Sequence, residues 1–185
     1  AELRHHGATD VIRRADAEIE NLTLVSSFGA ESVALLHLAS MVSRDIPVLF
    51  IDTEMLFAET LVYQQELSER LGLRNVTTLR SAEIAAQDPD GTLHQYDTDA
   101  CCALRKVEPL RRHLATQRAW VTGLRRDQGV TRSETRKIEI DHVNGGVVKL
   151  NPIADWTRER VMEYVRAHAV PVTIPISGST APARD

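Results

Sequence analysis

Short apolar runs, typical of buried strands, alternate along the chain with segments in which apolar residues recur at helical spacing. This pattern predicts strands that alternate with amphipathic helices. Helical periodicity covers residues 31–43, with an apolar face at Val33, Leu36 and Met41, and it returns over residues 57–72, ending at Gly72, a typical C-cap residue. Short apolar runs predict four strands, at residues 21–28, 46–52, 75–81 and 118–124. The alternation predicts an α/β fold with a doubly wound, mainly parallel sheet.

The last third of the chain shows a different pattern. Residues 138–153 contain two short strand patterns around Asn144-Gly145-Gly146, which predicts a hairpin. Thr157 is expected to cap a helix that starts at Arg158. Residues 81–99 are polar and rich in turn formers, which predicts a surface loop. We expect one domain over residues 1–185, with an atypical tail from about residue 172.

Composition narrows the range of functions. The net charge of -4 argues against general nucleic-acid binding, which requires a basic field. No apolar run approaches the length that spans a membrane, and the first ten residues have no signal-peptide pattern, so we expect a cytoplasmic protein without a membrane partner.

The segment SSFGAES lies between the first predicted strand and the first predicted helix, where a helix N-terminus could bind an anion. Gly29 would allow a tight turn, and the serines would add hydroxyl donors. An ordinary strand-to-helix turn explains the same residues equally well. The segment has no GxxxxGK[ST] pattern, and Glu31 would repel a triphosphate, so a smaller or less charged anion fits better.

Polar residues also follow the second and fourth predicted strands. Asp52 and Thr53 could bind an adenine or ribose, or they could cap the next helix. Arg125, Arg126 and Arg132 could grip phosphate or sulfate oxygens, or they could form a solvated charged run. Because the carboxyl ends of parallel strands meet at one edge, all three loops are expected around one crevice.

The two cysteines, Cys101 and Cys102, are adjacent in sequence. A disulfide between neighbours would be strained, and structural zinc sites use spaced pairs. An iron–sulfur cluster requires four ligands, whereas the chain has two cysteines. Arg105 and Lys106 would help to keep thiolates ionised. From spacing alone, a pair of small buried side chains in a helix is the simpler interpretation.

Five motifs in this order, SSFGAES, IDTEMLFAET, CCALRKVEPL, GLRRDQ and NPIADW, resemble the assimilatory sulfonucleotide reductases, and in particular the adenylylsulfate (APS) reductases. The resemblance implies an adenine nucleotide α-hydrolase-like fold with a modified pyrophosphatase (PP) loop. It implies thioredoxin-dependent reduction of adenosine 5′-phosphosulfate to sulfite and AMP through a cysteine thiosulfonate. The adjacent cysteines favour APS over its 3′-phosphorylated form (PAPS) and imply a [4Fe-4S] cluster.

The resemblance also assigns residues. Cys101 and Cys102 would be cluster ligands, and Lys106 would be catalytic, at the sulfate end. The substrate-binding set would comprise Ser26, Ser27, Phe28, Gly29, Ala30, Glu31, Ser32, Ile51, Asp52, Thr53, Glu54, Arg125, Arg126 and Arg132. The family's second cysteine pair and its nucleophilic cysteine have no counterpart in the 185 residues.

Three other functions stay open. A PAPS reductase is the nearest, and a nucleotide-binding domain whose adjacent thiols sense a metal or redox state belongs to another class. An adenylating ATP pyrophosphatase would need SGGxDS, from which Phe28, Ala30 and Glu31 depart. The sequence leaves a homo-oligomer open.

Overall fold

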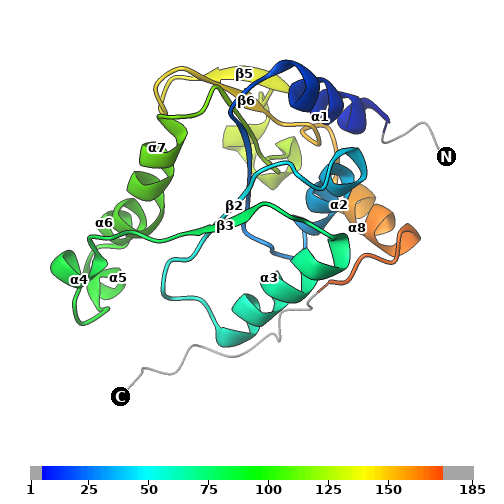
Figure 1. Ribbon diagram of the computed structural model, residues 1–185. Coiled ribbons are helices and arrows are strands. Elements are labelled where there is room, and N and C mark those ends of the chain that lie inside the picture. Colours follow the sequence, from blue (N-terminus) through cyan, green and yellow to red (C-terminus); the bar gives the residue numbers. More distant parts are fainter. Residues whose placement is uncertain (1–5, 173–185) are drawn as a thin grey trace.

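The computed structural model describes residues 6–172, which form a sheet covered by helices (Figure 1). Six strands lie in the order β3-β2-β1-β4-β6-β5. All neighbours pair in parallel except β5 with β6, which are antiparallel. The strands are β1 (Leu22–Ser26), β2 (Val48–Ile51), β3 (Val76–Leu79), β4 (Ala119–Val121), β5 (Ile138–Asp141) and β6 (Val147–Leu150). This topology confirms the predicted mainly parallel α/β fold.

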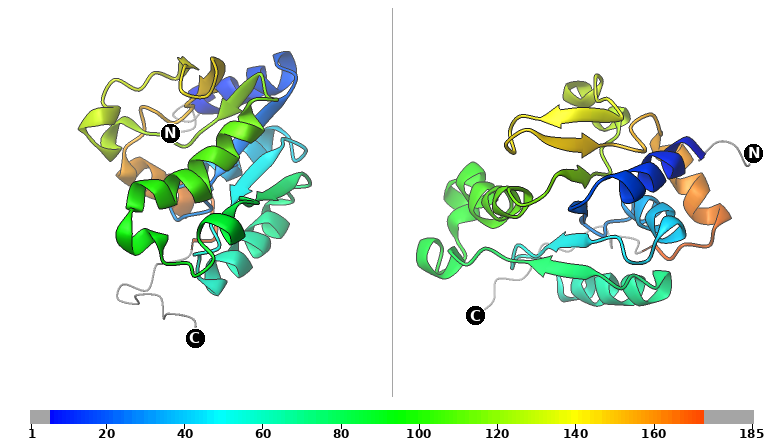
Figure 2. Two further views of the ribbon diagram at one scale, coloured as in Figure 1. Left: turned by 90° about the vertical axis from the view of Figure 1, so that its left-hand side faces the viewer. Right: turned by 45° about the horizontal axis from the view of Figure 1, so that its top comes forward.

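Helices cover both faces of the sheet. They are α1 (His6–Glu18), α2 (Val33–Val42), α3 (Ala58–Leu71), α4 (Ile84–Gln87), α5 (Leu93–Tyr96), α6 (Thr98–Cys102), α7 (Glu108–Leu114) and α8 (Arg158–Ala167), with a π-helical turn, η2 (Ala103–Val107), between α6 and α7. Figure 2 shows α7 on the face of the sheet opposite α1 and α2. Right-handed crossovers require this arrangement, because the chain leaves β3 at one side of the sheet and returns to β4 at the other side of β1.

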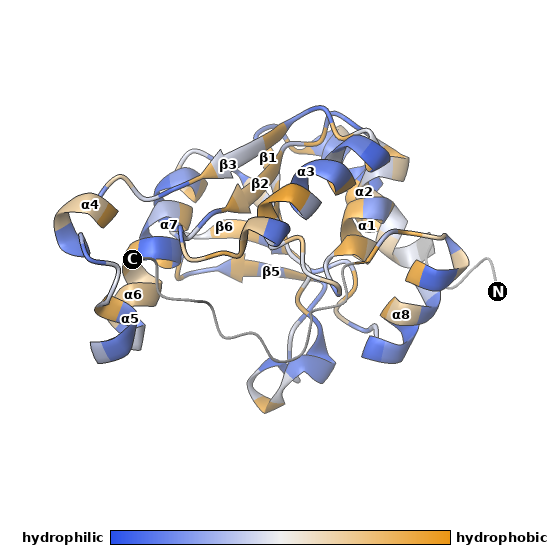
Figure 3. Cartoon of the chain, turned by 90° about the horizontal axis from the view of Figure 1, so that it is seen from below, coloured by the Kyte–Doolittle hydropathy of each residue, from blue (hydrophilic) through white to orange (hydrophobic). Residues whose placement is uncertain are grey.

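The main core lies between the sheet and the layer that contains α1, α2 and α8. Leu24, Leu36 and Val121 are among its fully buried side chains. Figure 3 shows apolar strands inside the fold and polar residues along the outer sides of the helices. Val33 and Leu36 of α2 are buried as predicted, whereas the prediction for Met41 was wrong, since this side chain is 50% exposed. The Met41 sulfur accepts a hydrogen bond from the Tyr164 hydroxyl of α8 at 3.8 Å.

Three local predictions are confirmed. Gly72 ends α3 with φ 66°, a left-handed conformation that glycine adopts without strain. Residues 142–146 join β5 to β6 in a hairpin, with positive φ at Gly145 and Gly146. The Thr157 hydroxyl caps α8 by accepting the Arg160 amide at 3.2 Å.

Two parts of the fold differ from the sequence prediction. Residues 81–99, expected as a loop, contain the single-turn helices α4 and α5. Helix α1, which the apolar pattern did not predict, packs against α2. No helix within residues 6–172 is long and apolar enough to cross a membrane. The expected atypical tail from about residue 172 falls almost wholly outside the described residues.

Candidate functional site

The sheet brings four loops to one edge, because β1, β2, β3 and β4 are parallel and end there. Two ion pairs join neighbouring loops. Arg125 Nη2, after β4, lies 2.8 Å from Glu31 Oε2, after β1. Arg80 Nε, after β3, lies 2.8 Å from Asp52 Oδ2, after β2. The helices that flank β1 and β4 cover opposite faces of the sheet. Doubly wound proteins bind ligands at the sheet edge where the helices change face in this way.

The loop after β1 is held by its own hydroxyl groups. Ser26 Oγ, which is buried, accepts the Phe28 amide at 3.1 Å, and Ser27 Oγ lies 3.0 Å from Ser32 Oγ. Ser32 occupies the N-cap position of α2, but its side chain makes no capping hydrogen bond. The first-turn amides of α2 therefore have no side-chain cap, which suits them to an anion.

Phe28 and Gly29 both contribute to the turn in this loop. Phe28 has φ 56°, an unusual conformation for an aromatic residue. Gly29 does not have a positive φ, and its carbonyl accepts the Ser32 amide at 2.8 Å. Burial holds Phe28 in place, since its ring packs edge-on against Phe50 with centroids 5.4 Å apart. A Cβ at Gly29 would lie 3.4 Å from Ser27 Oγ, in ordinary contact. Gly29 is exposed, so a side chain at this position would lie at the surface of the loop.

The loop after β2 is also tied by side chains. Asp52 is buried, and its Oδ1 accepts the Glu54 amide at 2.9 Å, while Thr53 Oγ1 accepts the Met55 amide at 3.4 Å. Glu54 has φ 59°. Helix α3 begins at Ala58, so the alternative that Asp52 or Thr53 caps it was wrong.

Strain at Glu54 gives a testable prediction. Glu54→Gly is expected to raise the free energy of unfolding by about 1 kcal/mol, because glycine adopts positive φ without steric cost. Glu59→Gly, a matched exposed control in the first turn of α3, is expected to lower it by about 0.5–1 kcal/mol. Urea unfolding measures both. Equal destabilisation by the two changes would contradict the strain at Glu54.

Arg125 forms the centre of a second network. Its side chain is 2% exposed, its Nε lies 2.9 Å from Asp127 Oδ1, and its Nη1 has no hydrogen-bond partner among residues 6–172. Glu31 also pairs with Arg158 Nε at 3.2 Å, and the Arg158 amide donates to Asp127 Oδ2 at 2.6 Å. The network connects the loop after β1, the loop after β4 and the start of α8. It balances the charge of Glu31 with two arginines.

The other two arginines of this segment are exposed. Arg126 Nε donates to the Thr135 carbonyl at 2.8 Å, and Arg132 Nη1 donates to Gln128 Oε1 at 2.7 Å. These contacts order the turns after β4. They leave both guanidinium groups accessible to an anion.

The cysteines lie at the end of α6 with different surroundings. Cys101 is buried and Cys102 is exposed, and both are free thiols. Four residues further on, Arg105 is buried and Lys106 is exposed, so each cysteine has a basic residue one turn away. Arg105 Nη2 contacts Asp88 Oδ2 at 2.6 Å, and its hydrogen bond lowers the pKa of the Asp88 carboxyl. The guanidinium is thus engaged by Asp88.

The cysteine region does not fit a four-cysteine cluster on this chain alone. The sequence has two cysteines, and the described residues contain no group of three or more His, Cys, Asp or Glu side chains that could hold a metal. A metal centre here would need ligands beyond those that residues 6–172 bring together.

Burial predicts a difference in thiol reactivity. In the folded protein, iodoacetamide is expected to modify Cys102 quickly and Cys101 slowly, because the reagent reaches an exposed thiol first. Mass spectrometry should show one rapid adduct, which Cys102→Ser removes and Cys101→Ser retains. Equal rates at the two cysteines would contradict the burial of Cys101.

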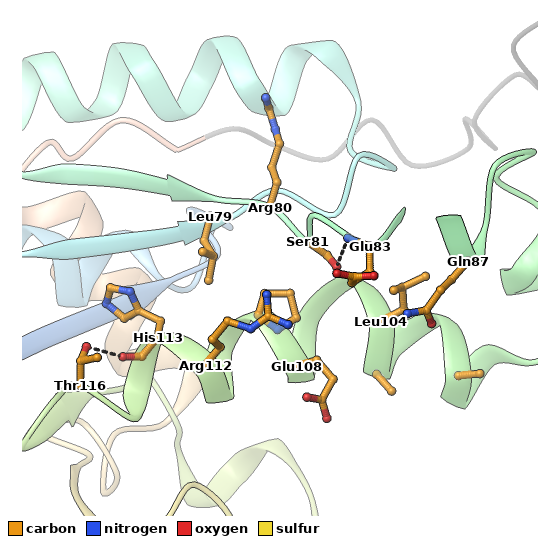
Figure 4. Close-up of a pocket in the computed structure, with 13 residues that line it drawn as sticks. Leu79, Arg80, Ser81, Glu83, Gln87, Leu104, Glu108, Arg112, His113 and Thr116 are labelled. Atoms are coloured by element: carbon orange, nitrogen blue, oxygen red, sulfur yellow. Dashed lines mark hydrogen bonds between the residues drawn. The ribbon is translucent and has the colours of Figure 1, made fainter. Parts of the chain in front are cut away.

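A hollow of about 790 Å³ lies beside this helical segment, outside the end of β3 (Figure 4). Its walls include Leu79, Arg80, Glu83, Leu104, Arg112 and His113. Partial burial lowers the pKa of His113. None of the residues that the sequence predicts for the substrate lines this hollow.

The fold is a mainly parallel α/β domain of the PP-loop type. Residues 21–174 match the family model of the phosphoadenosine phosphosulfate reductase domain, and the chain belongs to this family. Adenosine 5′-phosphosulfate reductase of Mesorhizobium japonicum is 41% identical over 170 residues, covering 90% of this chain and 66% of the relative. The same-named protein of Chelativorans sp. is 40% identical over 149 residues, covering 80% and 60%. The chain therefore spans less than two thirds of the length of these two relatives.

A solved structure supports the fold. Phosphoadenylyl-sulfate (PAPS) reductase from Candida auris, in a phosphate complex, superposes with a TM-score of 0.77 at 25% identity, covering 90% of this chain and 81% of that chain.

Proposed function

We propose that this chain binds adenosine 5′-phosphosulfate and takes part in its thioredoxin-dependent reduction to sulfite and AMP, in the cytoplasm. One observation carries the proposal: two loops with fixed shapes, after β1 and β2, lie side by side at the sheet edge next to the uncapped N-terminus of α2. The resemblance in motifs and the names of the relatives favour APS as the nucleotide.

The loop after β1, residues 26–32, would hold the phosphosulfate with the α2 amides. The loop after β2, residues 51–54, would hold the adenosine. Lys106 would contact the sulfate, and the exposed Arg126 and Arg132 would contact the anion. Arg125 would shape the loops through Glu31 and Asp127, with Nη1 as its remaining donor.

In the proposed reaction a thiolate attacks the sulfur of APS, a sulfur–sulfur bond forms, and the bond from sulfur to the bridging oxygen breaks. AMP leaves with the electron pair. The dithiol of thioredoxin then reduces the resulting thiosulfonate, releasing sulfite and leaving a thioredoxin disulfide. Lys106 would stabilise the charge that develops on the departing oxygen.

The nucleophile of this family has no counterpart in the 185 residues, so this chain would supply substrate binding and charge stabilisation. Cys101 and Cys102 would be two of the four ligands of a [4Fe-4S] cluster. Because the chain does not fit that cluster by itself, we assign no step of the reaction to it.

PAPS is the second candidate substrate, because the Candida auris structure is a PAPS reductase. A nucleotide-binding domain that senses redox state is a third candidate, which the exposed Cys102 favours. Calorimetric titration with APS, PAPS and AMP distinguishes the three candidate functions. We expect APS to bind at least tenfold more tightly than PAPS, and AMP to bind detectably.

Gly29→Asp provides the variant for this test. A carboxylate at this exposed position of the loop after β1 should weaken APS and AMP binding at least tenfold, because it would repel the anionic nucleotide. Ala17→Asp, at an exposed position of α1, is the control and should bind as the unmodified chain does. Tighter binding of PAPS would favour the second candidate. Absence of nucleotide binding would refute the proposal.

A further inference from the structure

Arg105 is a buried cation in the middle of a helical segment. Its side chain is 4% exposed, and that of its partner Asp88 is 3% exposed. A buried ion pair persists only where good geometry and further hydrogen bonds compensate for lost hydration. Here Asp88 Oδ1 also accepts the Leu93 amide at 3.0 Å, which fixes the carboxylate on its own loop.

The guanidinium makes a second bond, toward the nucleotide loop. Arg105 Nη1 donates to the Thr53 carbonyl at 2.7 Å, across 52 residues of sequence. One side chain therefore joins the loop after β2, the connection between α4 and α5, and the helical segment with the cysteines. The Arg105 Nε is buried and has no hydrogen-bond partner among residues 6–172. The guanidinium therefore makes its hydrogen bonds through Nη1 and Nη2.

The loop after β2 needs an external support of this kind. Its amides at Glu54 and Met55 bond to side chains of the same loop, and Glu54 is held at a positive φ. Residues in sparsely populated conformations persist only when their surroundings hold them. Arg105 also lies in a π-helical turn, a feature common at functional sites, and its neighbour Lys106 is the residue expected at the sulfate.

We propose that Arg105 is a positioning residue that fixes the loop after β2 for the nucleotide and sets the place of Lys106 relative to that loop. This inference rests on the proposed function, because the ligand of the loop is taken to be an adenine nucleotide. Arg105 acts through the Thr53 carbonyl and makes no contact with the substrate.

The test uses AMP as the probe. Arg105→Lys keeps the charge for Asp88 but cannot form the two-pronged contact to Asp88 and Thr53. The double variant Arg105→Met with Asp88→Asn removes both charges, so no unpaired ion remains buried. Both variants are expected to raise the dissociation constant of AMP about tenfold or more. The control Arg111→Met, at an exposed residue of α7, should stay within about twofold.

Hydrogen exchange supplies a readout that does not depend on the ligand. The amides of residues 52–55 are expected to exchange faster in both Arg105 variants than in the unmodified chain, at temperatures where thermal scans show all proteins folded. A purely structural role would lower the unfolding midpoint while leaving the AMP affinity of the folded double variant unchanged.

Three outcomes are distinct. Weaker AMP binding with faster loop exchange in a folded variant would support the proposal. AMP binding by all folded variants with equal affinity would overturn this inference and leave the proposed function intact. Failure of the unmodified chain to bind AMP would overturn both.

Discussion

Replacing Arg125 with methionine is expected to lower the free energy of unfolding by about 3 kcal/mol, the largest stability effect in the crevice. The side chain is 2% exposed, and its removal leaves Glu31 and Asp127 without their shared buried partner. Both carboxylates are partly exposed and Glu31 keeps Arg158, which limits the loss. Urea unfolding monitored by circular dichroism measures the change.

Arg126→Met, at the next residue, is the matched control. The Arg126 guanidinium is exposed and donates to a carbonyl rather than to a carboxylate. It should change the free energy of unfolding by less than about 0.5 kcal/mol. A loss below about 1 kcal/mol at Arg125 would show that its ion pairs do not hold the loops together.

Lys106→Ala is expected to weaken APS binding about 10–100-fold while changing AMP binding less than about threefold. The change would remove a charged hydrogen bond to the sulfate of APS, whereas AMP has no sulfate to lose a contact. The side chain is exposed, so the fold should keep its stability. Calorimetric titration of both nucleotides measures the difference.

Arg112→Ala is the control for this prediction. Arg112 is an exposed cation of α7 that lines the hollow beside β3 rather than the crevice. It should bind both nucleotides as the unmodified chain does. Equal losses of APS and AMP affinity at Lys106 would contradict a contact with the sulfate.

The strands of this fold could be predicted because each is a short apolar run bounded by polar turns. Gly72, the hairpin at Gly145-Gly146 and the Thr157 cap could also be predicted, since each depends on local backbone chemistry. The parallel order then brings the loops after β1, β2 and β4 to one edge. Pattern and topology together therefore predict that these three loops meet at one sheet edge.

The internal geometry of the crevice could not be predicted in the same way. Gly29 is the usual signal for a positive φ, but burial against Phe50 places that conformation at Phe28. The sequence also associates Arg105 with the cysteines. The spacing of four residues shows that Cys101 and Arg105 share a face, yet the partner of Arg105 is Asp88, in a segment expected to be a loop. Such contacts depend on tertiary packing.

In the proposed complex, the nucleotide binds between the loops after β1 and β2. The most direct test is an amide chemical-shift map of the 185-residue chain titrated with AMP. We predict the largest shifts at residues 26–32 and 51–54. Shifts concentrated at Leu79, Glu83 and His113, around the hollow beside α7, would contradict this placement.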